Sequence, residues 1–193
     1  MMMHPLIETI QKTSEFSPEA ADLFLSIFEE KEYKKNTILL ESGKVSHEVF
    51  FILKGALRQF YIDENGNEKI CNFSFENEFL TDLESFSRQI PSHSTIIAQE
   101  DCICLVTNCV KLVEAIKKSD DIAKFFSVVV ENVAADSIRR TKSLLSFSPE
   151  KQFLELIQDK PQILQRIPQR YIAQYLGIAP ESLSRIRKRL AKS

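Results

Sequence analysis

The hydrophobic and polar positions change their spacing twice along the chain. Between about residues 33 and 107 the apolar residues gather in short runs, such as 49–53 and 56–62, and glycine separates these two. Short apolar runs bounded by turn residues indicate β-strands. On either side of this region, apolar residues recur every three or four positions, as on one face of a helix. The pattern therefore predicts an α+β protein in which helices flank an antiparallel β-domain.

An Asn-Gly pair, Asn65-Gly66, separates the apolar runs 56–62 and 69–73. Both residue types tolerate positive φ, so the pair predicts a hairpin with positive φ at its tip. The chain has only four glycines, and each lies where the backbone is expected to turn. Short strands at this spacing suggest a β-roll or a sandwich.

Helix signals flank the β-region. Ser17, Pro18 and Glu19 supply an N-cap, a first-turn proline and an acid at the positive end of a helix. A much longer helix is predicted for residues 119–147, because its apolar residues form a wide stripe at helical spacing. The stripe comprises Ile122, Phe125, Phe126, Val129, Val130, Val133, Ala134 and Ile138. We expect the β-domain to cover one side of this stripe and a partner helix to cover another; packing within one chain is the alternative.

A new helix start after the long helix marks a domain boundary. Ser148, Pro149 and Glu150 again provide an N-cap, a first-turn proline and an acid. The predicted organisation is a β-domain at residues 1–118, the long helix at 119–147 and a helical unit at 148–193.

Composition is that of a soluble globular protein, with 44% hydrophobic and 27% charged residues. No apolar run reaches the roughly 18 residues that a membrane span needs, and the N-terminus lacks the pattern of a secretory signal. We therefore expect a cytoplasmic protein without a membrane partner. The four cysteines, which include no C-x-x-C pair, agree with that compartment. Cys102 and Cys104 fall on one face of a predicted strand and are interpreted as packing residues; a metal, cluster or redox site is the alternative.

Charge is distributed unevenly, although the net charge is only −2. Residues 147–193 carry nine basic and four acidic side chains, a balance of +5, whereas residues 1–146 carry 16 basic and 23 acidic ones, a balance of −7. An acidic body with a basic C-terminal unit is typical of a protein that binds nucleic acid with a separate module. Charge alone leaves open a merely solvated basic helix.

The segment 169–190 meets the steric demands of a helix-turn-helix. Two helices that cross steeply need a small residue at their closest approach, and Ala173 is placed there. Gly177, four residues later, suits the left-handed backbone of the turn. Pro180 and Glu181 suit the first turn of the second helix. The apolar anchors that would face the crossing are Ile172, Leu176, Ile178, Leu183 and Ile186.

The outward face of the second helix supplies the predicted DNA contacts. Glu181 is expected to accept from cytosine, Arg185 to donate to guanine, and Ser182 to serve a base or a phosphate. Phosphate contacts, which position a protein without specifying sequence, are expected from Gln169, Arg170, Arg187, Lys188 and Arg189. An ordinary helical hairpin with a solvated polar face is the alternative. The small residue, the glycine, the anchors and the positive charge together favour binding to double-stranded DNA.

The order of these features resembles the Crp–Fnr family, the cyclic-AMP-receptor-like bacterial transcription regulators. The likeness covers nearly the whole chain through a short helical start, residues 41–43, the strand 49–55, the Asn-Gly hairpin, residues 77–80, the long helix, and Glu-Ser-Leu-Ser-Arg at 181–185. The resemblance implies that 1–118 is an effector-sensing β-roll and that a homodimer forms along 119–147. It also implies that 148–193 binds DNA half-sites about one helical turn apart, and that the protein contacts RNA polymerase.

The sequence departs from the family in the cyclic-nucleotide cassette. Members that bind cyclic nucleotides have a Gly-Glu pair, whose glutamate holds the ribose, and a downstream Arg-Ser/Thr pair, whose arginine neutralises the phosphate. Here these positions hold Thr81-Asp82 and His93-Ser94. Threonine lacks glycine's backbone freedom, aspartate is one methylene shorter, and histidine is mostly neutral and cannot form arginine's fork. We therefore expect no cyclic AMP; the pocket would hold another small molecule or none. The candidate pocket residues are Thr81, Asp82, Arg88, His93, Ser94 and Thr95, with Arg88 a candidate substitute for the arginine.

The end of the chain differs too. Three residues follow Leu190 in this sequence, so we expect no β-hairpin wing of the kind that often follows the recognition helix. Pro180 stands where some relatives have a base-reading arginine. The operator sequence therefore cannot be copied from the best-known members.

Two other functional classes remain as alternatives. A cupin-like, metal-dependent enzyme would need clustered histidines, whereas His4, His47 and His93 are scattered, so we expect no catalytic residue, no metal and no cofactor. His47 is expected in a surface loop. A protein-docking adaptor would show no salt-dependent binding to any duplex.

Overall fold

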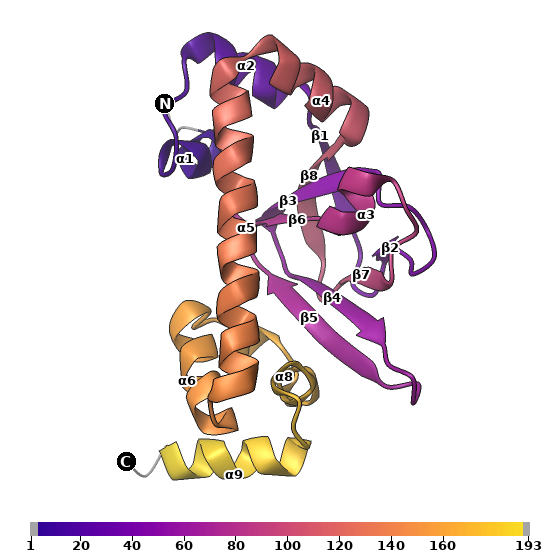
Figure 1. The fold of residues 1–193 in the computed structure, drawn as a ribbon, viewed down its shortest axis with the longest axis vertical. Coiled ribbons are helices and arrows are strands. Elements are labelled where there is room, and N and C mark those ends of the chain that lie inside the picture. Colours follow the sequence, from indigo (N-terminus) through magenta and orange to yellow (C-terminus); the bar gives the residue numbers. More distant parts are fainter. Residues whose placement is uncertain (1–3, 191–193) are drawn as a thin grey trace.

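The computed structural model describes residues 4–190 and shows a β-domain, a long helix and a terminal group of helices (Figure 1). The strands are β1 Glu29–Tyr33, β2 Ile38–Leu40, β3 Glu48–Lys54, β4 Leu57–Ile62, β5 Glu68–Ser74, β6 Phe79–Leu80, β7 Ser94–Ala98 and β8 Cys102–Asn108. The helices are α1 Pro5–Gln11, α2 Pro18–Ser26, α3 Leu83–Arg88, α4 Cys109–Lys118, α5 Asp120–Ser146, α6 Pro149–Asp159, α7 Ile163–Arg166, α8 Gln169–Leu176 and α9 Pro180–Leu190. Within the described residues, no helix combines the length and apolar character that crossing a bilayer requires.

The β-domain consists of two four-stranded antiparallel sheets, ordered β1-β8-β3-β6 and β2-β7-β4-β5. Side chains from both sheets, among them Phe50, Leu57 and Ile96, form the core between them. The predicted antiparallel β-roll is confirmed. The predicted start of the strands near residue 33 is too late, however, because β1 already spans Glu29–Tyr33. β1 is an edge strand with mostly charged residues, so no apolar run marks it.

Cys102 and Cys104 both lie on β8 and belong to the core between the sheets, with exposed fractions of 2% and 0%. Burial raises the pKa of Cys102 to about 11 and that of Cys104 to about 12. A thiol with a raised pKa is a poor nucleophile and a poor metal ligand. The burial agrees with the interpretation of these residues as packing residues.

β4 and β5 form the predicted hairpin. At its tip Gly66 has φ +80°, whereas Asn65 is not among the residues with positive φ. The Asp63 carboxylate accepts hydrogen bonds from the backbone N–H groups of Asn65 at 3.0 Å and Asn67 at 2.9 Å. Because this side chain organises the loop, only the glycine takes the left-handed conformation.

The apolar stripe of α5 is covered along only part of its length. Near the start of the helix, Ile122 and Phe125 are buried in the core formed with α1, α2 and α4, and the Phe125 ring lies 5.8 Å from that of Phe24. Every residue from 131 to 139 is exposed, including Ile138 at 69%. The β-domain and its helices therefore leave the second half of the stripe uncovered.

The terminal helices pack on the sheet that contains β4 and β5. One hydrophobic core joins Phe60, Ile70 and Phe73 of this sheet to the buried residues of α6–α9. Those residues are Phe153, Leu156, Ile163, Ile172, Ala173, Leu176, Leu183 and Ile186. Arg58, only 4% exposed, lies 4.5 Å from the Phe60 ring centroid and 4.0 Å from that of Tyr171 on α8. The β-domain and the terminal helices thus form one packed body.

Candidate nucleic-acid interface

α8 and α9 are joined by a three-residue turn, 177–179. Gly177 has φ +69°, its N–H donates to the Gln174 carbonyl at 3.1 Å, and the Ile178 N–H donates to the Ala173 carbonyl at 3.0 Å. This pair of bonds is the Schellman motif that ends many helices. A Cβ at Gly177 would meet no atom within 4 Å, so the left-handed backbone, not lack of space, favours glycine.

The apolar anchors predicted between the two helices are buried. Ala173 and Leu183 are fully buried, and the other anchors, Ile172, Leu176 and Ile186, are at most 7% exposed. Ile178 in the turn is partly buried against the same core. The packing therefore fixes one face of α9 inward, and the opposite face is turned to solvent.

The outward face of α8 and α9 carries the predicted DNA-contacting residues. Glu181, Arg185 and Lys188 are exposed, and Ser182 and Arg187 are half-buried. Gln169 and Arg170 are exposed at the start of α8, where Arg170 stacks on the Tyr171 ring at 4.6 Å. Arg189 forms an ion pair with Glu150 of α6. Exposed basic side chains thus lie on both α8 and α9, and one acid, Glu181, lies at the start of α9.

Arg140 connects α5 to α8. Its guanidinium donates to the backbone carbonyl of Tyr175 and lies 3.8 Å from the centroid of that ring. Burial lowers the pKa of Arg140 from its ordinary value. A cation at the C-terminal end of α8 also compensates the negative end of the helix dipole. Nearby, Ser143 donates to Glu155 of α6 at 2.9 Å.

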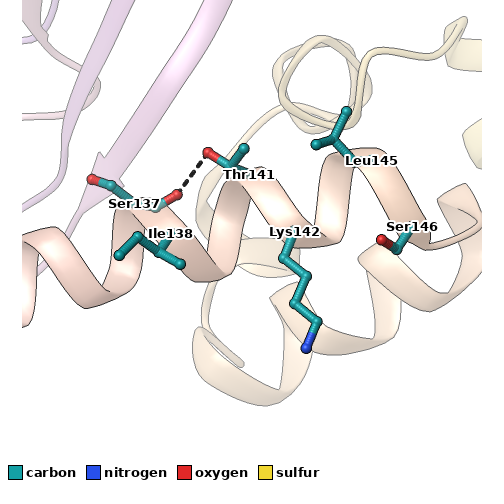
Figure 2. Close-up of a pocket in the computed structure, with 6 residues that line it drawn as sticks. All are labelled: Ser137, Ile138, Thr141, Lys142, Leu145 and Ser146. Atoms are coloured by element: carbon teal, nitrogen blue, oxygen red, sulfur yellow. Dashed lines mark hydrogen bonds between the residues drawn. The ribbon is translucent and has the colours of Figure 1, made fainter.

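A shallow hollow follows the exposed part of α5 (Figure 2). Residues of a single helix line it: Ser137, Ile138, Thr141, Lys142, Leu145 and Ser146. Leu145 is 82% exposed and Ile138 69% exposed, and these two large apolar side chains lie two turns apart on one helix face.

The residues predicted to form the effector pocket are largely hydrogen-bonded to one another. The Asp82 carboxylate accepts from the hydroxyls of Ser92 and Ser94, both at 2.6 Å, and caps α3 through the Ser85 N–H at 3.1 Å. Burial acts to raise the pKa of Asp82, but these hydrogen bonds outweigh it and hold the pKa below its ordinary value. Thr81 donates to the Glu48 carbonyl at 2.9 Å. The carboxylate thus already accepts three hydrogen bonds from its own chain.

Two further candidates for this pocket, Arg88 and His93, are exposed. Arg88 is exposed and forms an ion pair with Glu84 of the same helix at 3.2 Å. His93 is exposed, whereas its neighbour Ser94 is buried. The hydroxyl of Thr95 accepts from the Ser42 N–H at 3.2 Å. Among the predicted pocket residues, hydrogen bonds therefore join Asp82 to Ser94, whereas Arg88 pairs with Glu84 and Thr95 with Ser42.

His47, like His93, is exposed. Among residues 4–190, no group of three or more His, Cys, Asp or Glu side chains lies close enough together to hold a metal ion.

The sequence did not indicate the residues that hold the terminal helices on the β-domain. Arg58 could have been noticed as a candidate for such a contact, because it is a charged residue in an otherwise largely apolar predicted strand. In the structure it is buried. Arg140 gave no such signal, since its neighbours on α5 are polar and its partner, Tyr175, is 35 residues away.

Comparisons with known proteins agree with this architecture. A family model described as "Cyclic nucleotide-binding domain" matches residues 30–119, the β-domain and α4. A search of curated proteins by sequence finds no match. Among solved structures, the regulator CLP of Xanthomonas campestris is 14% identical, with 91% of this chain and 92% of that chain covered and a TM-score of 0.71. FixK2 of Bradyrhizobium japonicum is 16% identical, with 86% and 85% covered and a TM-score of 0.72. A Crp/Fnr-family transcriptional regulator of Eubacterium rectale is 17% identical, with 91% and 84% covered and a TM-score of 0.69.

Residues 30–119 thus match the cyclic nucleotide-binding domain, and the whole chain has the fold of these Crp–Fnr regulators. The match extends over the long helix and the terminal helices as well as the β-roll.

Proposed function

We propose that this chain is a dimeric, sequence-specific DNA-binding transcription regulator of the Crp–Fnr type, which recognises a palindromic operator. The observation that carries the proposal is the pair α8 and α9, joined by the left-handed Gly177, with one face buried and the opposite, mainly basic face exposed. An α-helix presented in this way fits the major groove of DNA.

Direct contacts with base edges are assigned to the first two turns of α9. Arg185 donates to guanine, Glu181 accepts from the amino group of cytosine, and Ser182 serves either a base or a phosphate. Contacts with phosphates are assigned to Gln169, Arg170, Arg187, Lys188 and Arg189. The exposure of Glu181 and Arg185 supports this assignment, since nothing within residues 4–190 covers them.

The dimer is assigned to the uncovered apolar stripe of α5. The helix has 27 residues and is therefore about 40 Å long. Two such helices packed in parallel along Ile138 and Leu145 would bury these exposed side chains and place both copies of α9 at the same end. This is the arrangement that two half-sites of a palindrome require.

The sensor role of the β-domain is proposed without cyclic AMP. The Asp82 carboxylate is already engaged by Ser92 and Ser94, and Arg88 is paired with Glu84. We propose that the β-domain binds a different small effector or none. We also propose that the regulator contacts RNA polymerase. A calorimetric titration with cyclic AMP and cyclic GMP should show no micromolar binding, and micromolar binding would overturn this part.

The central test is a selection of random duplex DNA with the purified protein. We expect the recovered sequences to share an inverted repeat. Four cationic phosphate candidates in each protomer predict a strong salt dependence, with log Kd against log salt rising with a slope of up to about 7. Absence of salt-dependent binding to any duplex would contradict the proposal and favour a protein-docking role.

A further inference from the structure

We propose that Arg166 is a positioning residue that, with Glu76 and Glu100, fixes the orientation of α8 and α9 relative to the β-domain. These three residues, with the ion pair Lys160–Glu78 beside them, are called the clamp. The inference rests on the proposed DNA-binding function, to which it adds the device that sets the separation of the two recognition helices.

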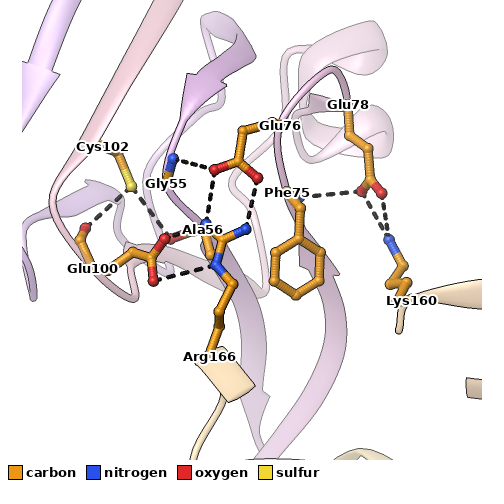
Figure 3. Close-up of polar contacts among 9 residues, drawn as sticks. All are labelled: Gly55, Ala56, Phe75, Glu76, Glu78, Glu100, Cys102, Lys160 and Arg166. Atoms are coloured by element: carbon orange, nitrogen blue, oxygen red, sulfur yellow. Dashed lines mark hydrogen bonds and ion pairs between the residues drawn. The ribbon is translucent and has the colours of Figure 1, made fainter. Parts of the chain in front are cut away.

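The clamp joins the segment between α6 and α8 to two turns of the β-domain (Figure 3). Arg166 is the last residue of α7, three residues before α8 begins. Glu76 and Glu78 lie between β5 and β6, and Glu100 lies between β7 and β8. Because these turns follow different strands of the roll, the arginine is attached to two separate turns.

The geometry of the clamp is that of a two-carboxylate site for one guanidinium. Nη1 of Arg166 donates to Oε2 of Glu76 at 2.6 Å, and Nη2 donates to Oε1 of Glu76 at 2.8 Å. Nη2 also donates to Oε1 of Glu100, and Nε donates to Oε2 of Glu100 at 3.5 Å. A guanidinium held by two carboxylates on two sides cannot rotate without breaking directed bonds.

The carboxylate of Glu76 is also held by a backbone group of the β-domain. Its Oε1 accepts from the Gly55 N–H at 2.8 Å. Burial acts to raise the pKa of Glu76, but the hydrogen bonds from Arg166 and from backbone N–H groups keep it below its ordinary value. Beneath the turn, the Cys102 thiol donates to the carbonyls of Glu100 at 3.1 Å and Ala56 at 3.3 Å. The acceptors of the clamp are therefore part of a closely packed set of turns.

Both cations of the clamp also lie against one buried ring. The guanidinium carbon of Arg166 is 5.0 Å from the Phe75 centroid, and Nζ of Lys160 is 5.6 Å from it. Phe75 is 1% exposed and belongs to the core shared with the terminal helices. The Arg166 side chain is 22% exposed, so its ion pairs are less screened than those of a surface pair.

The orientation that the clamp fixes matters for a palindrome. α5 and α6 are separated by Phe147 and Ser148, a short non-helical link about which the terminal unit could turn. The apolar contacts of the shared core resist separation, but they are less directional than bidentate ion pairs. Two half-sites reinforce each other only if both copies of α9 are held at the matching separation, because rotational freedom lowers the effective concentration at the second half-site.

The test compares Arg166→Gln and the double variant Glu76→Gln/Glu100→Gln with the wild type. Three duplexes serve as probes: the palindrome recovered by selection, a duplex with one half-site, and the palindrome with two base pairs inserted at its centre. Lys111→Gln is the matched control, because it breaks an ion pair with Glu29 elsewhere on the β-domain. Lysine in place of Arg166 should restore part of the effect.

We expect both clamp variants to lose about 10-fold in affinity for the palindrome, with little change for the single half-site and a smaller penalty for the inserted base pairs. For the double variant, the two explanations predict changes of opposite direction in the affinity for the palindrome. Removing two negative charges strengthens binding to every duplex if only net charge matters, whereas loss of the clamp weakens binding to the palindrome. An unchanged or higher ratio of palindrome to half-site affinity in either variant would overturn the proposal.

Amide hydrogen exchange separates this inference from the proposed function. Faster exchange in α8 of the variants, with the core strands unchanged, is expected if the clamp orders the terminal unit. Unchanged exchange in α8 would overturn the clamp even if the protein binds DNA. If the wild type binds no duplex, the regulator assignment fails, and faster exchange in α8 would then support only the ordering role.

Discussion

Replacing Gly177 by alanine tests the turn between α8 and α9. At this position the energetic effects of backbone strain, unfolded-state entropy and steric contact can be separated. The residue has φ +69°, and a side chain in that region costs roughly 1–2 kcal/mol. Alanine recovers about 0.4–1 kcal/mol by making the unfolded chain less flexible. No steric term is added, because a Cβ would meet no atom within 4 Å. We therefore expect Gly177→Ala to lower the free energy of unfolding by about 1 kcal/mol, which corresponds to about 2–4 °C in Tm for a chain of 193 residues.

Gly66 provides the matched control. It has φ +80°, and a Cβ there would also meet nothing within 4 Å, but it lies in the β4–β5 hairpin. Gly66→Ala should show the same loss of stability without a loss of DNA affinity. Gly177→Ala should weaken DNA binding as well, because the turn sets the angle between the two helices. Gly177→Asn should recover part of both losses, since asparagine tolerates the left-handed region.

Gly55 tests the steric part of the reasoning. It has φ +102°, and a Cβ there would lie 2.6 Å from the Cys102 thiol and 2.7 Å from the Asp101 carbonyl oxygen. Gly55→Ala therefore adds overpacking to backbone strain and should cost about 3 kcal/mol. Urea unfolding monitored by circular dichroism measures the stability loss of each of the three glycine variants. Wild-type stability of Gly177→Ala would refute the left-handed turn, and equal losses at all three glycines would refute the steric argument.

Three further outcomes are expected. Arg185→Ala should reduce discrimination between operator and random DNA by about 1–3 kcal/mol, whereas Lys188→Ala should weaken both alike and reduce the salt slope; identical behaviour of the two variants would contradict their roles. Leu145→Glu should convert a dimer to a monomer in sedimentation analysis because it places a charge on the face of α5 that carries the exposed Ile138, whereas the exposed Val110 of α4 should tolerate the same change; a dimeric Leu145→Glu would contradict the assigned interface. Asp82→Asn should lower stability at pH 7 by about 2 kcal/mol, since it removes hydrogen bonds to a charged acceptor. The pKa of Asp82 is depressed in the folded state, so its contribution is present above the ordinary aspartate pKa and is lost as pH falls through the folded value; the variant should therefore show a flatter acid limb in unfolding measured against pH.

The sequence predicts best what depends on local chemistry. The strands of the β-roll follow from short apolar runs. The turn at Gly177 and the burial of Ala173 follow from the residue types that such a turn and crossing require. The long helix is predicted within one residue at each end, and Ser119 and Phe147, the two residues by which the ranges differ, are its caps.

Features that depend on distant partners could not be read in the same way. β1 was missed because an edge strand of charged residues has no apolar pattern. The hydrogen bonds that occupy Asp82 come from serines ten and twelve residues later, across a helix and a turn. Arg166 meets acids 66 and 90 residues away, and no local periodicity reports such a contact.

The core shared by the β-sheet and the terminal helices has a consequence for protein engineering. If the terminal helices α6–α9 were separated from the chain at the link after α5 and fused to another receptor, each fragment would expose apolar side chains. Phe73 and Phe75 would be exposed on the β-domain, and Phe153 and Ile163 on the transferred helices. Both fragments would then be prone to aggregate. Chimeras of this protein should therefore exchange the β-domain and the terminal helices together. A change of DNA specificity is better made by replacing side chains on the surface of α9.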